Sequence, residues 1–307
     1  MPYVTESNIT DIVLDRWRAV PDPRLRTIMQ SMIRHLHEFV RDIEPSEHEW
    51  TTAIEWLTRT GQLSTDKRQE FILASDVVGV SMLVDCINHR LPGGATPTTV
   101  TGPFHIQDSP NLDHGGDIAH GASGERCFIV GSVRDLQGRP IPGATLDIWQ
   151  ADADGLYEAQ RGCAGPWMRG VFKSRQDGSF IVQTLLPVPY PIPLDGSVGE
   201  LMRRTDISPM RPSHVHFLIS APGHREVITH LFKKSCPYIE TDVVYGVKAP
   251  LIAEFRLFPA GSPTPTGQIS RQPFWLLEYD FVLQPAAKAD SAESSSEASL
   301  SEENSTV

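Results

Sequence analysis

The segment RPSHVHF, residues 211–217, places two histidines, His214 and His216, one residue apart within an apolar run. The run continues as LIS and favours a β-strand, on which side chains two positions apart point to the same face. Their Cα atoms would lie about 6.6 Å apart, so both imidazoles can reach one metal ion. Two hydrogen-bonded structural histidines are an equally good interpretation of this pair alone.

A second His-x-His pair, His35 and His37, serves as an internal comparison. It lies in a stretch whose apolar residues recur at helical spacing. Two helical residues subtend about 200° around the axis, so these two imidazoles diverge. We therefore interpret His35 and His37 as surface histidines.

The sequence around residues 211–217 is rich in β-type runs, separated by turn signals such as Asp154-Gly155 and Asp177-Gly178. This pattern predicts an all-β sandwich over residues 93–285. The predicted strands are CFIVGSVRD, ATLDIWQAD, GSFIVQTLL, SHVHFLIS, VITHLF and FWLLEYDFVL.

The preceding part, residues 1–92, has the periodicity of amphipathic helices. Ser46 and Glu49 form a capping-box pattern, and Asp66 and Gln69 resemble one before the predicted helix FILASDVVGVSMLVDCINHR. The wide apolar faces of these helices must bury against each other, the sandwich or a second copy. The fold class expected is therefore α+β, with an N-terminal helical domain before the sandwich. Residues 286–307, rich in Ser and Glu, are expected to form a disordered acidic tail.

Composition and charge exclude several classes of function. The net charge of −11 argues against a nucleic-acid partner, which requires clustered Lys and Arg. No apolar run is long enough to span a membrane, and the N-terminus does not resemble a signal peptide. The four cysteines show no CxxC pairing, and we expect each to be a small buried hydrophobic residue. A cytoplasmic protein is the expectation.

The tyrosines offer further candidate metal ligands. Tyr157 ends WQADADGLY after a predicted strand, and Tyr190 lies between two prolines in PVPYPIP. Prolines stiffen such a loop, although a packed aromatic residue is an alternative interpretation. Two phenolates with two imidazoles form a hard ligand set that favours Fe(III) over zinc or copper(I).

WQADADGLY, PVPYPIP and RPSHVHF, in this order, resemble the intradiol ring-cleaving catechol dioxygenases. EFILASDVVGVSMLVD, TVTGPFH, THLF and YGVK look most like the hydroxyquinol 1,2-dioxygenase branch. The resemblance implies non-haem Fe(III) held by Tyr157, Tyr190, His214 and His216. It also implies a charge-stabilising role for Arg211 and a proton-accepting role for Tyr190. His230 replaces the glutamine of many catechol enzymes, so its catalytic role is less defined.

By position in the family, a substrate pocket is expected from both halves of the chain. Its expected lining is Leu73, Asp76, Val100, Gly102, Pro103, Phe104, Ile192, Pro193 and Val244. Asp76 is either the acceptor for a third substrate hydroxyl or an Asp at the helix surface or between domains; both remain open.

The activity implied is cleavage of hydroxyquinol (benzene-1,2,4-triol) by O2 to 3-hydroxy-cis,cis-muconate, which tautomerises to maleylacetate. A catechol or chlorocatechol 1,2-dioxygenase is the alternative within the family. VGSVRDLQGRPIPGATLDIWQADADGLY also resembles a transthyretin-like binding module, a non-enzymatic alternative. The family further implies a homodimer through the N-terminal helices and a phospholipid at its interface.

Overall fold

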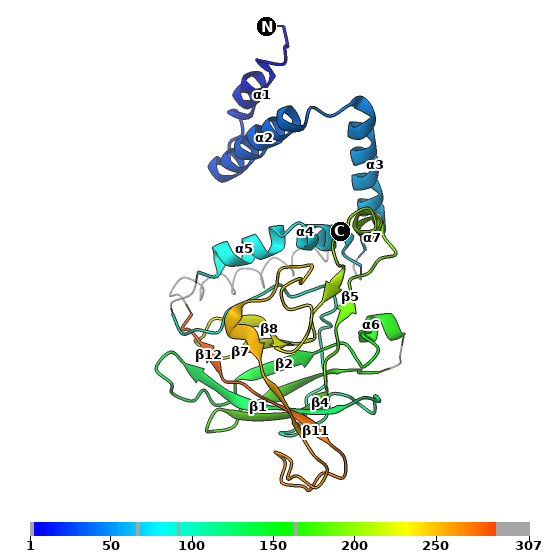
Figure 1. Ribbon diagram of the computed structural model, residues 1–307. Helices are drawn as coiled ribbons and strands as arrows, with labels where there is room; N and C mark the ends of the chain where they lie inside the picture. The colour runs from blue at the N-terminus through cyan, green and yellow to red at the C-terminus, as the bar shows by residue number, and fades with distance from the viewer. Residues whose placement is uncertain (1–2, 66–67, 91–92, 163–164, 287–307) are drawn as a thin grey trace, which may run out of the picture. The chain divides into compact units, whose positions relative to one another are not determined.

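The computed structural model describes residues 3–65, 68–90, 93–162 and 165–286, coloured along the chain in Figure 1. Asp66, Cys163 and nearly all of the expected acidic tail lie outside these ranges. The chain divides into two compact units, Met1–Gly61 and Gln62–Val307. The domain boundary expected at residues 92/93 stays a prediction. None of the described helices is long and apolar enough to cross a membrane.

The first unit is helical: α1 is Ile9–Trp17, α2 is Pro23–Ile43, and α3, Glu47–Leu63, begins in it. The capping box before α3 is present, because Glu49 N donates to Ser46 Oγ and Ser46 N donates to Glu49 Oε2. The two histidines of α2 differ. His35 is exposed as expected, whereas His37 is half-buried, with its Nδ1 3.0 Å from the Thr10 hydroxyl.

The second unit begins with two short helices, α4 (Glu70–Val77) and α5 (Val80–Asn88). One continuous helix was predicted here, and that prediction is wrong. Gly79 has φ +75°, a left-handed conformation that glycine adopts at little cost, and it interrupts the helix between α4 and α5. Glu70, at the start of α4, is buried and accepts the Val198 N–H at 3.0 Å. This bond ties α4 to α7 (Ser197–Met202), beside the sandwich.

The sandwich has two five-stranded sheets. One contains β1 (Arg126–Asp135), β4 (Ser179–Leu185), β10 (Phe255–Phe258), β11 (Phe274–Glu278) and β12 (Phe281–Leu283). The other, in strand order, contains β3 (Arg169–Lys173), β2 (Thr145–Trp149), β7 (His214–Ser220), β8 (Val227–Lys233) and β9 (Ile252–Ala253). The connections hold α6 (Glu158–Arg161), the 3-10 helix η1 (Ala249–Leu251) and a two-stranded ribbon of β5 (Tyr190–Pro191) and β6 (Met210–Arg211).

The expected α+β class and sandwich are confirmed, with one difference at the C-terminal strand. FWLLEYDFVL forms β11 and β12, both parallel to β1, instead of one strand. The chain crosses β1 between them, where a Cβ at Gly131 would lie 1.7 Å from the Tyr279 carbonyl oxygen. Only glycine fits at that crossing.

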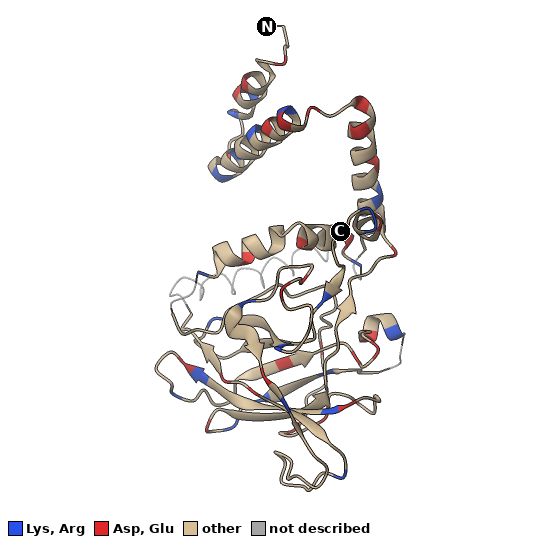
Figure 2. Cartoon of the chain, in the orientation of Figure 1, with Lys and Arg blue, Asp and Glu red and all other residues tan. Residues whose placement is uncertain are grey.

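A hydrophobic core fills the space between the sheets and includes Ile129, Phe180, Phe217 and Phe281. Each fully buried side chain of this size contributes about 1.5–3 kcal/mol to folding. The strand that carries the two histidines belongs to this core, and Figure 2 shows no charged residue along it. Among the cysteines, Cys127 and Cys236 are buried as expected, but the expectation is wrong for Cys86, which is exposed on α5.

Candidate metal centre and substrate pocket

His214 and His216 extend from β7 toward the same point, as their spacing predicts. Their Nε2 atoms lie 3.1 Å apart. Both residues are 2% exposed. His214 Nδ1 donates to the Pro212 carbonyl at 2.6 Å, so its Nε2 carries the lone pair. His216 stacks on Trp149 of the neighbouring β2, with ring centroids 4.7 Å apart. The rings are therefore held in one orientation by the sheet.

Tyr157 reaches the same point from the loop that follows β2. Asp152 shapes this loop: its carboxylate accepts the backbone N–H groups of Asp154 and Leu156 at 2.9 and 3.2 Å. Gly155 has φ +79°, and a Cβ there would lie 2.9 Å from the Cβ of Tyr190. The Asp-Gly turn thus allows the two tyrosines to approach each other.

Tyr190 lies on the short ribbon, where β5 pairs with β6 and Tyr190 is opposite Arg211. Its neighbour Ile192 is held by a backbone bond to the Pro209 carbonyl at 3.0 Å. The pairing fixes the phenol ring next to the guanidinium. A loop stiffened by two prolines therefore gains a second constraint that the sequence alone did not reveal.

The four side-chain tips converge. Tyr157 Oη lies 2.8 Å from Tyr190 Oη and 2.9 Å from His216 Nε2, and Tyr190 Oη lies 3.2 Å from His214 Nε2. Ligand atoms that each lie about 2 Å from one ion must lie about 3 Å from one another. Four donor atoms from imidazole and phenol groups thus share one buried point, with the His214 lone pair directed toward it. The residues present therefore fit a metal ion.

Burial sets the protonation of these ligands. It lowers the pKa of His214 and of His216 well below the ordinary value, with further lowering from neighbouring imidazole and guanidinium groups. Both are thus neutral, the form that binds metal. Burial also raises the pKa of Tyr157 and of Tyr190 above the ordinary value of a phenol. Without a cation both stay protonated, so metal binding must release protons.

A third imidazole, His230 of β8, adjoins the centre. It is opposite His216 in the β7–β8 pair, with ring centroids 4.0 Å apart. His214, His216 and His230 form the one group of three His, Cys, Asp or Glu residues close enough to share a metal within the described ranges. His230 Nε2 is buried without a hydrogen-bond partner, and its Nδ1 is 3.5 Å from Arg211 Nη2. In position it is a neighbour of the ligand rings and of Arg211.

A small pocket lies beside the four tips, and the structure brings all nine residues expected at the substrate site to its wall. Their companions in the lining are Tyr190, Arg211 and His216. Its free volume of about 20 Å³ holds about one water molecule, whereas benzene occupies engineered cavities of about 150 Å³. An aromatic ring therefore enters only if a wall moves. Two larger cavities adjoin it. One of about 740 Å³ shares Asp76, Val100 and Gly102 with its lining, and one of about 720 Å³ shares Leu73, Pro103, Phe104 and Pro193.

Asp76, on α4, is the one carboxylate in the pocket lining. It is 3% exposed, so the alternative of an exposed helix-surface Asp is wrong. Its Oδ1 is buried without a hydrogen-bond partner, and burial raises its pKa above the ordinary value. An unpartnered buried acceptor in an apolar wall is suited to receive a hydrogen bond from a bound molecule.

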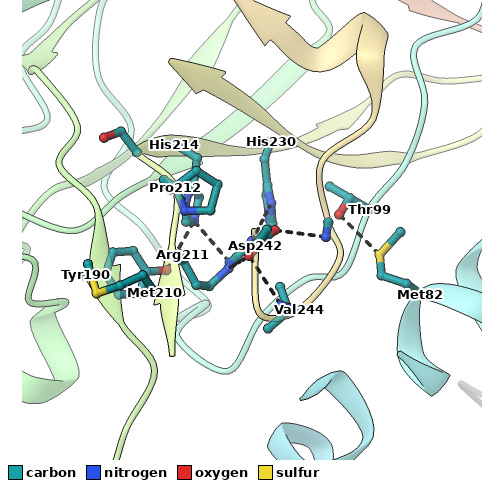
Figure 3. A network of polar contacts seen from close by, with 12 residues as sticks. Met82, Thr99, Tyr190, Met210, Arg211, Pro212, His214, His230, Asp242 and Val244 are labelled. Atoms are coloured by element: carbon teal, nitrogen blue, oxygen red, sulfur yellow. Dashed lines mark hydrogen bonds and ion pairs between the residues drawn. The ribbon is translucent and has the colours of Figure 1, made fainter. Parts of the chain in front are cut away.

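Arg211 lines the pocket and is also buried, with its Nη1 3.2 Å from His214 Nε2. Figure 3 shows its partner, Asp242, whose Oδ1 lies 3.2 Å from Arg211 Nε. Asp242 was not predicted from the sequence. The two residues are 31 positions apart, and a single acid in TDVVYG carries no pattern that would identify it.

Phenol and imidazole groups that converge in a sandwich, beside a small and mostly apolar pocket, are typical of a metal-dependent enzyme. Two family models match the chain: "Catechol dioxygenase N terminus" over residues 22–96 and "Dioxygenase" over residues 100–285. The chain belongs to the intradiol ring-cleaving dioxygenase family.

Individual relatives agree with this assignment. The chain is 44% identical to the 6-chlorohydroxyquinol 1,2-dioxygenase of Cupriavidus pinatubonensis, over 93% of this chain and 99% of the relative. It is 43% identical to the hydroxyquinol 1,2-dioxygenase of Nocardioides simplex, over 92% and 96%. The crystal structure of hydroxyquinol 1,2-dioxygenase from Pseudomonas putida superimposes with a TM-score of 0.86 at 43% identity, covering 92% of this chain and 99% of that one.

Family membership decides whether the chain is an enzyme and which class of reaction it catalyses. The chain is a dioxygenase, which takes O2 and an aromatic diol, and the family uses non-haem iron. The non-enzymatic transthyretin-like module is thereby excluded, because such a module needs no convergent ligand set.

Proposed function

We propose that this dioxygenase cleaves the ring of hydroxyquinol between its two adjacent hydroxyl carbons and yields 3-hydroxy-cis,cis-muconate, which tautomerises to maleylacetate. Both atoms of O2 enter the product, so the reaction needs no other oxidant or reductant. The observation that carries the proposal is the one buried, unpartnered carboxylate oxygen, of Asp76, in a pocket beside the metal centre. The substrates printed in the names of the 43–44% identical relatives also support it.

The ligands that we assign to the iron are Tyr157, Tyr190, His214 and His216. Phenolate and imidazole donors favour the ferric state. Ferric iron at this site would lower the pKa of the substrate's adjacent hydroxyls and draw electron density from the ring. The stacks of Trp149 on His216 and of Phe104 on Tyr157, with centroids 4.7 and 4.5 Å apart, exclude water from one side of the ligands.

Tyr190 is the ligand that we expect to move. Its ring forms part of the pocket wall, and the pocket holds about one water molecule, so its displacement admits the substrate ring. The freed Tyr190 Oη then accepts a proton from one substrate hydroxyl. Because burial raises the pKa of this phenol, it retains the proton.

Arg211 stabilises the negative charge that develops on the ring. It is a buried cation that faces both the pocket and His214. A preorganised charge in a site without water is worth far more than in solution. We assign His230 the task of restraining the Arg211 side chain, because its Nδ1 lies 3.5 Å from Nη2.

The remaining assignments concern specificity and assembly. The nine predicted residues of the pocket lining bind the ring, and Asp76 accepts the third hydroxyl. We also propose a homodimer through the N-terminal helices, whose exposed apolar side chains include Met32, Leu36 and Phe39. The phospholipid at that interface and the cytoplasmic location remain expectations from the family and the sequence.

The test is oxygen uptake by the iron-loaded protein with hydroxyquinol and catechol side by side, for the wild type and Asp76→Asn. A hydrogen bond to a charged acceptor contributes about 1.5–3 kcal/mol, so kcat/KM for hydroxyquinol should fall about 10- to 150-fold in the variant. The value for catechol, which lacks the third hydroxyl, should change much less.

Each of the following results would contradict the proposal or one of its parts. Faster wild-type turnover of catechol than of hydroxyquinol would favour the catechol alternative, and a chlorinated catechol tested alongside would reveal the chlorocatechol one. An equal loss of kcat/KM on both substrates in Asp76→Asn would show that Asp76 does not determine substrate specificity. Fe(III)–phenolate pairs absorb visible light. A protein that stays colourless after iron loading would therefore exclude Tyr157 and Tyr190 as iron ligands.

A further inference from the structure

Arg211 and Asp242 form a buried ion pair in which only one partner faces the substrate pocket. Arg211 lines the substrate pocket, whereas Asp242 does not. The side chains of the two are 6% and 2% exposed. Asp242 therefore contacts the back of the guanidinium, at Nε and Nη2, while Nη1 faces His214.

The same carboxylate also fixes the loop after β8. Asp242 Oδ2 accepts the Gly246 N–H at 2.9 Å, and Oδ1 accepts the Val244 N–H at 3.4 Å. Val244 is part of the pocket wall. A Cβ at Gly246 would lie 3.2 Å from Asp242 Oδ2 and 3.3 Å from Arg211 Nη2, so this position must be small for the loop to close on the pair. Figure 3 shows Arg211, Asp242 and Val244 together.

The charge of Asp242 is what permits a buried arginine here. Burial by itself lowers the pKa of Arg211, yet the carboxylate of Asp242 raises it above the ordinary value. Without Asp242, Arg211 would be an unpaired cation next to a metal centre. Such a group turns toward water or disrupts its surroundings.

We propose that Asp242 is a positioning residue for ring cleavage: it holds the Arg211 guanidinium against the substrate ring. This inference rests on the proposed role of Arg211. Asp242 touches neither the substrate nor the ligand tips. It acts through Arg211, and its loss should resemble the loss of Arg211.

The experiment is a double-mutant cycle with Asp242→Asn, Arg211→Met and the double variant, in the full-length iron-loaded protein. Asp242→Asn should lower kcat for hydroxyquinol about 10- to 100-fold, somewhat less than the loss of a complete charge-stabilising donor. KM, iron content and the visible band should stay near wild type, because no ligand and no substrate contact is removed. In the Arg211→Met background, Asp242→Asn should cost no further kcat.

Asp135→Asn is the matched control. Asp135 is a buried aspartate that accepts from the Arg139 side chain and from two loop amides, as Asp242 does with Arg211, but it lies at the end of β1 outside the pocket. A variant there lowers stability without changing kcat. If Asp242→Asn does not fold, the cycle still compares Arg211→Met with the double variant, which has no unpaired charge.

Each outcome distinguishes the inference from the proposed function. If Asp242→Asn lowered kcat as much in the Arg211→Met variant as in the wild type, Asp242 would not act through Arg211. That result would overturn the inference. So would unchanged kcat in Asp242→Asn, or loss of iron from it. Failure of the wild type to turn over hydroxyquinol would instead overturn the proposed function.

Discussion

At the scale of single residues, the metal centre depends on four buried side-chain tips that can exchange their mutual hydrogen bonds for bonds to a cation. Two imidazoles and two phenols lie with their tips 2.8–3.2 Å apart and almost no exposure to water. Neutral histidines and protonated tyrosines are what this environment enforces. A cation displaces the phenol protons and turns the four tips into a set of ligands, so each tip should matter to metal affinity.

Tyr157→Phe tests this at one atom. Changes beyond the ligand sphere already cost metal sites about 10- to 100-fold in affinity or activity, so removal of the phenol oxygen itself should cost at least about 100-fold. Iron content by mass spectrometry should fall, and the visible band should weaken.

The control is Tyr279→Phe, whose hydroxyl donates to the Pro250 carbonyl at 3.1 Å, away from the pocket. It should keep its iron and its colour. Full iron content and an unchanged band in Tyr157→Phe would exclude this tyrosine as a ligand.

At the scale of elements, the loop that connects β2 to α6 holds Tyr157 in position beside the end of β2. Asp152 is its centre, because one carboxylate accepts two loop amides, Arg161 Nε at 2.6 Å and Trp167 Nε1 at 3.0 Å. Burial alone would raise the pKa of Asp152, but these bonds lower it below the ordinary value. The loop therefore draws stability from the ionised carboxylate.

Asp152→Asn should lower the free energy of unfolding by about 1–3 kcal/mol at neutral pH, the cost of leaving a buried polar partner unpaired. Because the folded pKa is lower than the unfolded value of about 3.9, the ionised Asp152 stabilises above that pH, and this contribution is lost as the pH falls further. The difference from wild type in urea unfolding should therefore shrink as the pH falls below about 4.

Asp177→Asn is the comparison, since Asp177 bonds the amide and hydroxyl of Ser179 in an exposed turn. Its cost should stay within about 0.5 kcal/mol. A pH-independent difference for Asp152→Asn would mean that the carboxylate charge does not stabilise the loop.

At the scale of the whole molecule, α2 carries an apolar face that the described chain leaves exposed. Its members follow helical spacing: Leu25, Ile28, Met32, Leu36, Phe39 and Ile43. A patch of this kind on a single chain marks an interaction surface. In a symmetric dimer each copy presents the same surface, so one added charge is buried twice.

Leu36→Asp should therefore convert the proposed dimer to a monomer, as measured by size-exclusion chromatography with light scattering. Thr27→Asp adds the same charge on the opposite side of α2, nine residues or about 180° away, and should remain dimeric. A dimeric Leu36→Asp would place the interface elsewhere. A monomeric wild type would overturn the dimer itself.

Much of the fold could be predicted because the strands depend on local sequence patterns. All six predicted runs form strands, since alternation and turn residues act over a few positions. The break at Gly79 and the division of FWLLEYDFVL were not predicted. Both depend on what the chain meets in space: the pairing with β1 decides the second, and a glycine within a helical pattern is often tolerated.

The sequence by itself determined that His214 and His216 share a face, because strand geometry relates residues two apart, and the family motifs named Tyr157 and Tyr190. Only the tertiary structure decided that these four tips meet, that Asp76 is buried with a free acceptor, and that Asp242 holds Arg211. The physical reason is separation along the chain. Side chains tens of residues apart interact only after sheet pairing and loop closure bring them together, and no local pattern encodes that distance.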